Sequence, residues 1–167
     1  MSKADKFRKG NFREHVLTKS MWVGADVVEP YEEWIWVEGK MVLMRAKYSH
    51  GGLKVICEII ENALDHWYED RSVTEIRVYF KPNGEIGVYN NGSGFPLRQI
   101  DGEYIPKIAA TQEFSGSNLS KDKDRVVGGT NGLGMKLVNI LSDWFEIETV
   151  DPTRKYISIN DSKKILK

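Results

Sequence analysis

The chain has 167 residues and no net charge, because 24 Lys and Arg residues balance 24 Asp and Glu residues. This length fits one domain, and a hydrophobic content of 41% excludes a disordered chain. Neutrality also excludes the simplest kind of nucleic-acid binding, in which an overall basic surface supplies the affinity. The lone Cys57 cannot form an internal disulfide, and no apolar run is long enough for a membrane span or a signal core. We therefore expect a soluble chain with no membrane partner, in the reducing cytoplasm or nucleus.

Apolar and polar residues predict a hairpin and then a long helix in the first half of the chain. The first 20 residues are polar and basic, and we expect them to form an arm outside the core. Two apolar stretches flank Glu38 and Gly39, which predicts a hairpin over residues 32–46. Apolar residues then recur every three or four positions, which predicts a helix over residues 52–68 with one buried face.

Turn residues divide the second half into further strands and helices. The predicted elements are two strands at 75–80 and 85–90, a helix from 106 to about 114, a loop over 115–131, a helix from 132–134 to 142, and two strands at 144–149 and 155–160. A polar loop as long as 115–131 is usually functional or disordered. Helices interleaved with antiparallel hairpins indicate an α+β fold, a sandwich of a sheet with helices on one face.

A polar stripe on the first long helix is one candidate site. Glu58, Asn62 and Asp65 follow one another at i, i+4 and i+7, so they share one helix face. Such a stripe is often only the solvated face of a helix. The mixture of residue types favours chemistry, since a carboxylate can take a proton from water and an Asn oxygen suits Mg²⁺.

The turn after the second predicted strand is another candidate site. It reads Asn-Asn-Gly-Ser-Gly-Phe-Pro from Asn90 to Pro96. One glycine already satisfies a turn, but the pair at Gly92 and Gly94 also lets a flat ligand approach the backbone. The adjacent Asn offers the donor and the acceptor that a nucleobase edge requires.

A Gly-rich segment from Gly128 to Leu137 leads into a predicted helix and is the third candidate. Such a junction presents backbone N–H groups to an anion. The segment fails the Walker pattern because Met135 stands where the lysine should be, and it fails the Rossmann pattern because Leu137 replaces the third glycine. We still expect it to hold phosphate, with Lys136 reaching the anion from the first helical turn.

In this order, the three motifs resemble the ATP-binding boxes of the GHKL superfamily, which includes gyrase-type topoisomerases, Hsp90-type chaperones, histidine kinases and mismatch-repair ATPases. The details are most similar to type II DNA topoisomerases of the eukaryotic and large-DNA-virus type. VICEIIENALDH is similar to their F-D-E-I-x-x-N-A-x-D, VYNNGSGFP to N-[ND]-G-x-G-I-P, and VVGGTNGLGMKLVNILSDWFEIET to V-T-G-G-x-N-G-x-G-x-K-L-x-N-I-F-S-x-x-F-x-x-E-T. The resemblance runs from about residue 13 to residue 150 and implies the Bergerat fold, a two-layer α/β sandwich with a mixed, mostly antiparallel sheet. Phe95 and Gly116 depart from the usual Ile and Ser.

The resemblance also implies a role for each matching residue. Glu58 would polarise the attacking water, Asn62 would ligate Mg²⁺ on the triphosphate of ATP, and Lys136 would be a catalytic cation on the phosphates. Asn91 would pair with the adenine amino group, and Asp65 would support the nucleotide-binding face. The other implied contacts to ATP are Gly94, Ser117, Asn118, Gly129, Asn131, Gly132, Leu133 and Gly134.

In the family, this fold belongs to a larger machine. The resemblance implies an N-terminal arm over residues 1–30 and an ATPase domain over residues 31–167, with the fold continuing past Lys167 into a transducer and DNA-cleavage domains. We therefore expect a piece of a larger enzyme, cellular or viral, or one subunit of a split enzyme, which reaches DNA through its complete form. ATP would order residues 115–131 as a lid and drive homodimerisation, closing a gate that controls DNA strand passage.

Two alternatives remain. One is a non-catalytic module or split subunit that dimerises when it binds nucleotide. The other is a GHKL ATPase of the chaperone or mismatch-repair type, which fits the Gly-rich loop and the arm less well.

Overall fold

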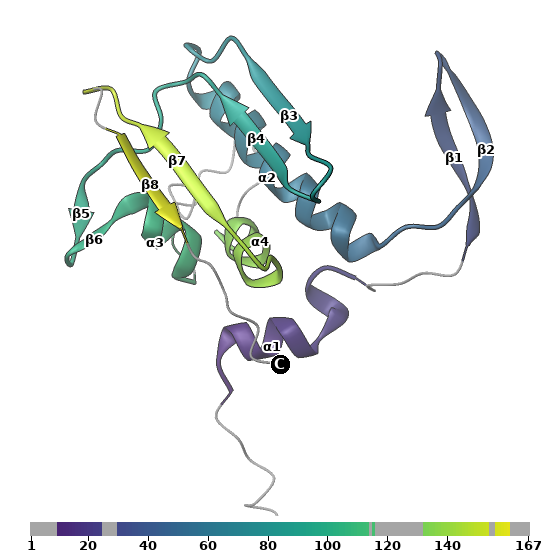
Figure 1. The fold of residues 1–167 in the computed structure, drawn as a ribbon, viewed down its shortest axis with the longest axis horizontal. Helices are drawn as coiled ribbons and strands as arrows, with labels where there is room; N and C mark the ends of the chain where they lie inside the picture. The colour runs from purple at the N-terminus through teal and green to yellow at the C-terminus, as the bar shows by residue number, and fades with distance from the viewer. Residues whose placement is uncertain (1–9, 25–29, 114, 116–131, 154–155, 161–167) are drawn as a thin grey trace, which may run out of the picture.

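The computed structural model of the chain describes residues 10–24, 30–113, 115, 132–153 and 156–160. Helices lie beneath the strand pairs of residues 76–90 and 146–160, and the hairpin of residues 31–46 projects away from them (Figure 1). The elements are α1 (Phe12–Thr18), the 3-10 turn η2 (Ser20–Trp22), β1 (Tyr31–Val37), β2 (Lys40–Ala46), α2 (His50–Glu69), β3 (Ile76–Phe80), β4 (Ile86–Asn90), β5 (Gln99–Ile100), β6 (Glu103–Tyr104), α3 (Ile105–Thr111), α4 (Gly134–Leu141), β7 (Glu146–Val150) and β8 (Tyr156–Asn160).

Helix α2 is the long helix that the apolar period predicts over residues 52–68, with two more residues at its start and one more at its end. The Ser49 hydroxyl accepts a hydrogen bond from the Gly52 N–H at 2.9 Å and so caps the helix N-terminus. At the other end, the Asp70 N–H donates to the His66 carbonyl at 2.7 Å. Like the other described helices, α2 is not long and apolar enough to cross a membrane.

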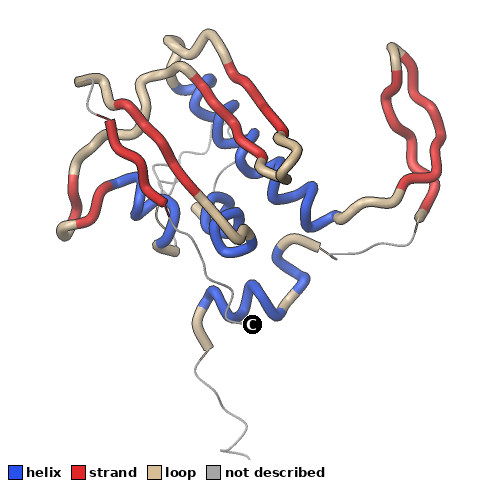
Figure 2. Tube along the Cα trace, viewed as in Figure 1, coloured by secondary structure: helices blue, strands red, loops and turns tan. Residues whose placement is uncertain are grey.

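The strands pair as antiparallel hairpins, which Figure 2 shows in red. Glu38 and Gly39 both have a positive φ, of 46° and 86°, as a two-residue turn between β1 and β2 requires. The hairpin of β5 and β6 has no strand signal in the sequence, because each strand has only two residues and shows no alternation. The Asp101–Gly102 pair, with φ values of 51° and 82°, is a typical hairpin turn and could have indicated this hairpin in the sequence.

The described strands form four separate pairs, whereas the sequence predicts a single sheet. The carboxyl ends of β4 and β7 nevertheless lie together. The Phe95 N–H donates to the Thr149 hydroxyl at 2.9 Å. A bond to a side chain thus joins these two hairpins, in place of backbone hydrogen bonds between β4 and β7. The expected layering therefore holds, while continuity of the sheet is not present among the described strands.

The core lies between three helices and β7. Ala110 of α3, Val138 of α4 and Phe145 form its buried centre. Val55 and Ile59 of α2 pack against this centre, together with Met135 and Ile147. Burial of these apolar side chains fixes α4 against α2, and this contact places the candidate site.

The N-terminal segment differs from the expected solvated arm. Asn11 caps α1 by accepting a hydrogen bond from the Glu14 N–H at 2.8 Å, and Val16 on that helix is only 3% exposed. Helix α1 contacts α4. With two turns only, α1 is too short to show an amphipathic period among its charged residues, which explains why the sequence pattern missed it.

We predict that Val16→Ala lowers the free energy of unfolding by about 1–2 kcal/mol, because it removes two buried methyl groups. Leu17→Ala is the matched control on the same helix, since Leu17 is 54% exposed. Urea denaturation measures both changes. Equal effects of the two substitutions would contradict the docking of α1 on α4.

Candidate functional site

The carboxylate of Glu58 lies against the start of α4. A side chain at Gly134, the first residue of α4, would overlap Glu58 Oε2, so a larger residue there would displace the carboxylate from this position. Helix α4 begins without a side-chain cap, and the first N–H groups of any helix have no partner within the helix. Glu58 is mostly buried and pairs through Oε1 with Lys54 Nζ at 2.6 Å. The structure thus joins two residues that are 76 positions apart in sequence, as the site prediction requires.

Asn62 lies one turn after Glu58 on the same face of α2. Its Nδ2 atom is buried and has no hydrogen-bond partner among the described residues. A buried amide without a partner is costly, typically by about 1–3 kcal/mol, and such groups are rare in folded proteins. This side chain therefore suits a polar ligand that enters beside Glu58.

Lys136 lies in the first turn of α4 but does not reach solvent. The residue is 3% exposed, and its Nζ donates to the Ser115 carbonyl at 2.6 Å. Burial lowers the pKa of Lys136 to about 8, while the carboxylate of Glu113 acts in the opposite direction. The Lys136 amine is thus held beside Ser115, with a pKa close enough to neutral pH that a nearby charge can change its protonation.

Ser115 and Gly132 meet beside Lys136. Gly132 has a φ of +60°, and a Cβ there would lie 2.6 Å from the Ser115 carbonyl oxygen, so a side chain is excluded on both counts. The Ser115 hydroxyl donates to the carbonyls of Ile108 and Gln112 at the end of α3. This packing ties the end of α3 to the start of α4.

The structure bears on which of the two asparagines at the end of β4, Asn90 or Asn91, can contact a base. Asn91 Oδ1 accepts hydrogen bonds from the Thr74 and Glu75 N–H groups at 2.9 and 3.0 Å, and its Nδ2 donates to the Thr74 hydroxyl at 2.8 Å. Both ends of the amide are therefore occupied, and the side chain as placed is not available to a base. The sequence prediction for Asn91 thus needs correction.

Asn90 is the better candidate for a base contact. Strand residues alternate between faces, and the exposed Tyr89 lies on the outer face, where the Arg77 guanidinium stacks 5.5 Å from its ring centre. Asn90 is half-buried and shares the opposite face with Val88, while β4 contacts α2. The alternation was readable in the sequence and could have identified Asn90.

The remaining predicted residues divide into placed and unplaced ones. Gly94 has a φ of +69°, and a Cβ there would overlap the Val150 carbonyl, so this turn packs on the end of β7. Asp65 is half-buried on α2, and Leu133 immediately precedes α4. Four of the predicted residues lie outside the described part of the chain: Ser117, Asn118, Gly129 and Asn131.

A metal centre made by the protein alone is not present in the described part of the chain, where no three His, Cys, Asp or Glu residues gather. Mg²⁺ often takes only one or two protein oxygens and completes its shell with phosphate and water. Asn62 offers an amide oxygen of the type that Mg²⁺ binds, while its unpaired, buried Nδ2 is a donor that suits a phosphate oxygen.

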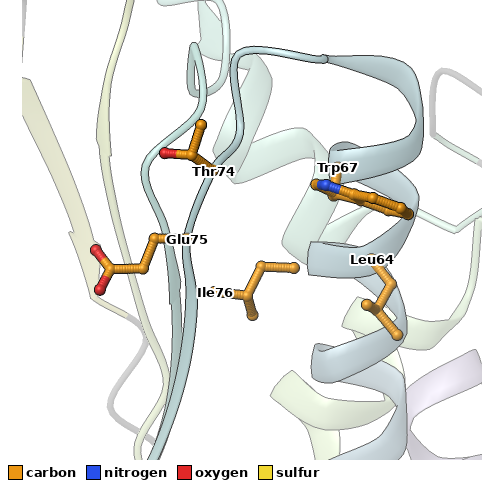
Figure 3. Close-up of a pocket in the computed structure, with 5 residues that line it drawn as sticks. All are labelled: Leu64, Trp67, Thr74, Glu75 and Ile76. Carbon is orange, nitrogen blue, oxygen red and sulfur yellow. The ribbon is translucent and has the colours of Figure 1, made fainter.

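A surface pocket lies apart from the residues around Glu58. It has a volume of about 280 Å³ and opens between α2 and the start of β3 (Figure 3). Ile76 points toward the helix, whereas Glu75 points away from it. Leu64 and Trp67 complete a mainly apolar lining, so no polar groups converge there as they do around Glu58.

Comparisons with known proteins point to one group. A sequence profile described as "Histidine kinase-, DNA gyrase B-, and HSP90-like ATPase" matches residues 52–161. The chain is 32% identical over 167 residues to a DNA topoisomerase 2 of African swine fever virus, and 33% identical over 150 residues to human DNA topoisomerase 2-beta. These matches cover 90% and 86% of this chain but only 14% and 9% of the two relatives.

Solved structures agree with the sequence matches. The ATPase region of Saccharomyces cerevisiae topoisomerase II superposes with a TM-score of 0.86 at 30% identity, covering 96% of this chain and 44% of that one. The ATPase and transducer domains of DNA topoisomerase II from Balamuthia mandrillaris give a TM-score of 0.87 at 28% identity, covering 98% and 43%. This chain therefore spans less than half of either structure.

We predict that Lys136→Met stabilises the protein relative to wild type more at pH 7 than at pH 10. Lys136 has a folded-state pKa of about 8, below its ordinary value of 10.5, so the folded state binds this proton less tightly than the unfolded chain. The cost of burying the charge is therefore complete below pH 8 and disappears as the pH rises toward 10.5.

Urea denaturation of both proteins from pH 7 to pH 10 measures this difference in the free energy of unfolding. Lys40→Met, which removes an exposed lysine of β2, is the control. A stability difference that stays constant across this range would show that Lys136 is not buried as a charge.

Proposed function

Because the chain belongs to the family of histidine kinase-, DNA gyrase B- and HSP90-like ATPases, we propose that it binds and hydrolyses ATP as the ATPase part of a type II DNA topoisomerase. The structural likeness to two topoisomerase II ATPase regions confirms the expected GHKL fold. The names of its relatives support the topoisomerase assignment over the chaperone and mismatch-repair alternatives.

The contact between Glu58 and the start of α4 carries the proposal. A triphosphate at the N-terminus of α4 would receive hydrogen bonds from its backbone amides, and its terminal phosphate would face the Glu58 carboxylate. Glu58 would accept a proton from water as the water oxygen bonds to the γ-phosphorus and the bond to the β-phosphate oxygen breaks. The products are ADP and inorganic phosphate, and the reaction mainly needs positioning and charge neutralisation.

Lys136 supplies positive charge to the same phosphates. Its ammonium now bonds to the Ser115 carbonyl, and it would exchange this neutral acceptor for a phosphate oxygen. An anion beside a buried amine favours the charged form, so phosphate binding would hold the proton on Lys136.

Asn62 would hold Mg²⁺ through its amide oxygen, and the ion would neutralise charge on the triphosphate when bound. Asp65 would support this face of α2. At the other end of the site, Asn90 would read the adenine edge with its amide, in place of Asn91, while Gly94 allows the base to approach the turn.

The complete enzyme would use this domain as an ATP-dependent gate. We propose residues 1–30 as an arm and residues 31–167 as the ATPase domain, and a second copy of the chain as the dimer partner. Strand passage through DNA would require the transducer and cleavage domains. The cytoplasm or nucleus suits the free thiol of Cys57, and similarity to the African swine fever virus enzyme is compatible with a viral source.

We predict that Glu58→Gln lowers the rate of single-turnover ATP hydrolysis by a factor on the order of 10²–10⁴, because the general base is lost. Nucleotide binding should be retained. Binding is measured as the rise in melting temperature with Mg²⁺ and a non-hydrolysable ATP analogue, since a ligand at about 100 times its Kd stabilises by about 2.7 kcal/mol.

Glu61→Gln is the matched control, because Glu61 lies on the same helix, 4.0 Å from the same Lys54. If wild type shows no thermal shift, nucleotide binding is excluded. If wild type and Glu58→Gln hydrolyse ATP equally slowly, the non-catalytic dimerisation module replaces the enzyme as the better account.

A matched pair of substitutions tests the corrected base contact. We predict that Asn90→Ala weakens binding of the ATP analogue by about tenfold, the loss of one good hydrogen bond, with little change in the melting temperature of the free protein. Asn91→Ala should instead lower the free energy of unfolding by about 0.5–1.5 kcal/mol, because the N–H groups of Thr74 and Glu75 lose the side-chain acceptor that ties them to the turn. Calorimetric titration and urea denaturation measure the two effects, and a reversed pattern would restore Asn91 as the base contact.

A further inference from the structure

The carboxylate of Asp70 ties the end of α2 to the turn that follows β4. Its Oδ2 accepts hydrogen bonds from the Ser93 N–H at 2.9 Å and the Ser93 hydroxyl at 2.7 Å. His66 Nε2 lies 3.3 Å from the same oxygen. Oδ1 accepts from the Ser72 N–H at 2.9 Å. One side chain thus gathers groups from the last turn of α2, the loop after it and a turn 23 residues away.

Gly92 packs directly on this cluster. A Cβ there would overlap Val73 Cγ2 and would lie 2.7 Å from His66 Nε2 and 3.2 Å from Asp70 Oδ2. The backbone at 92 can therefore approach the cluster only because it carries no side chain. The close packing and the hydrogen bonds fix the same short stretch of backbone.

The far side of the turn is held as well. The Phe95 N–H donates to the buried Thr149 hydroxyl, and Gly94 packs against the carbonyl of Val150. The Asn91 amide bonds to Thr74 and Glu75. Asp70 is thus the side chain that holds the backbone and the hydroxyl of Ser93 in the described part of the chain.

The bonds to Asp70 are of the strong kind. An ionised carboxylate that accepts hydrogen bonds from N–H and O–H groups forms shorter and stronger bonds than a neutral acceptor. The hydroxyl and N–H groups of Ser93 and Ser72 hold the pKa of Asp70 far below its usual range. The carboxylate therefore remains charged at neutral pH and serves as an acceptor only.

We propose that Asp70 is a positioning residue for the base end of the nucleotide site. Through Ser93 and Gly92, it would hold the turn so that Asn90 and the backbone at Gly94 present a fixed edge to the purine. This inference rests on the proposed function and adds that base recognition depends on a carboxylate that does not touch the nucleotide. The phosphate end, built on α4, is held independently by the Glu58 and Lys136 contacts.

The test separates the base end from the phosphate end. Asp70→Asn replaces one acceptor oxygen with a donor NH₂ group, which cannot accept from Ser93 when the other oxygen remains with Ser72. We expect its affinity for an ATP analogue to fall tenfold or more, while its affinity for inorganic tripolyphosphate changes less than twofold. In single turnovers, KM should rise and kcat should change little.

Ser93→Ala is the milder second variant, since it removes the hydroxyl bond and keeps the bond from the backbone N–H. It should show a smaller loss of ATP affinity with the same tolerance toward tripolyphosphate. Asp143→Asn is the control for charge, because Asp143 is an exposed carboxylate near the end of α4.

Each outcome decides the proposal. Unchanged ATP affinity in Asp70→Asn would overturn it, and so would an equal loss of affinity for ATP and tripolyphosphate in both variants, which is the result of a general loss of structure. If wild type binds tripolyphosphate and not ATP, both the proposed function and this inference are wrong. If wild type binds ATP and Asp70→Asn binds it with the same affinity, only this inference is wrong.

Discussion

The approach of the Glu58 carboxylate to the start of α4 is the constraint on which the rest of the site depends. Glycine at position 134 leaves room for it, because a side chain there would displace Glu58 Oε2. This approach also requires that α2 and α4 pack closely, which the apolar core around Val138 and Ile59 achieves. With these conditions met, the Glu58 carboxylate lies beside the N-terminal amides of α4, so the triphosphate of the proposed ligand would lie between them.

Two polar side chains near this contact could form hydrogen bonds with a ligand that they do not form well within the free protein. Asn62 has a buried Nδ2 without a described partner, and the Lys136 ammonium is buried on a neutral carbonyl with its pKa lowered to about 8. Each arrangement costs stability in the free protein. Phosphate oxygens would accept hydrogen bonds from both donors, so the stability lost in the free protein would be regained when nucleotide binds.

Residues with strong local signals were predictable from the sequence, and contacts between distant segments were not. The apolar period predicted α2, and the Gly-rich pattern together with the family resemblance predicted Glu58 and Lys136. Residue alternation along β4 could have selected Asn90, but a turn motif alone does not say which asparagine faces the helix. Asp70 and Ser93 lie 23 positions apart, and no local rule pairs them. Helix α1 was hidden by its short length and its charges.

A crystal structure of the chain with Mg²⁺ and a non-hydrolysable ATP analogue tests the central claim most directly. Our account predicts the triphosphate at the N-terminus of α4, with the terminal phosphate facing Glu58, Lys136 turned from Ser115 to a phosphate oxygen, and the purine beside Asn90. An analogue bound in the surface pocket beside Trp67, or a triphosphate directed away from Glu58, would contradict it.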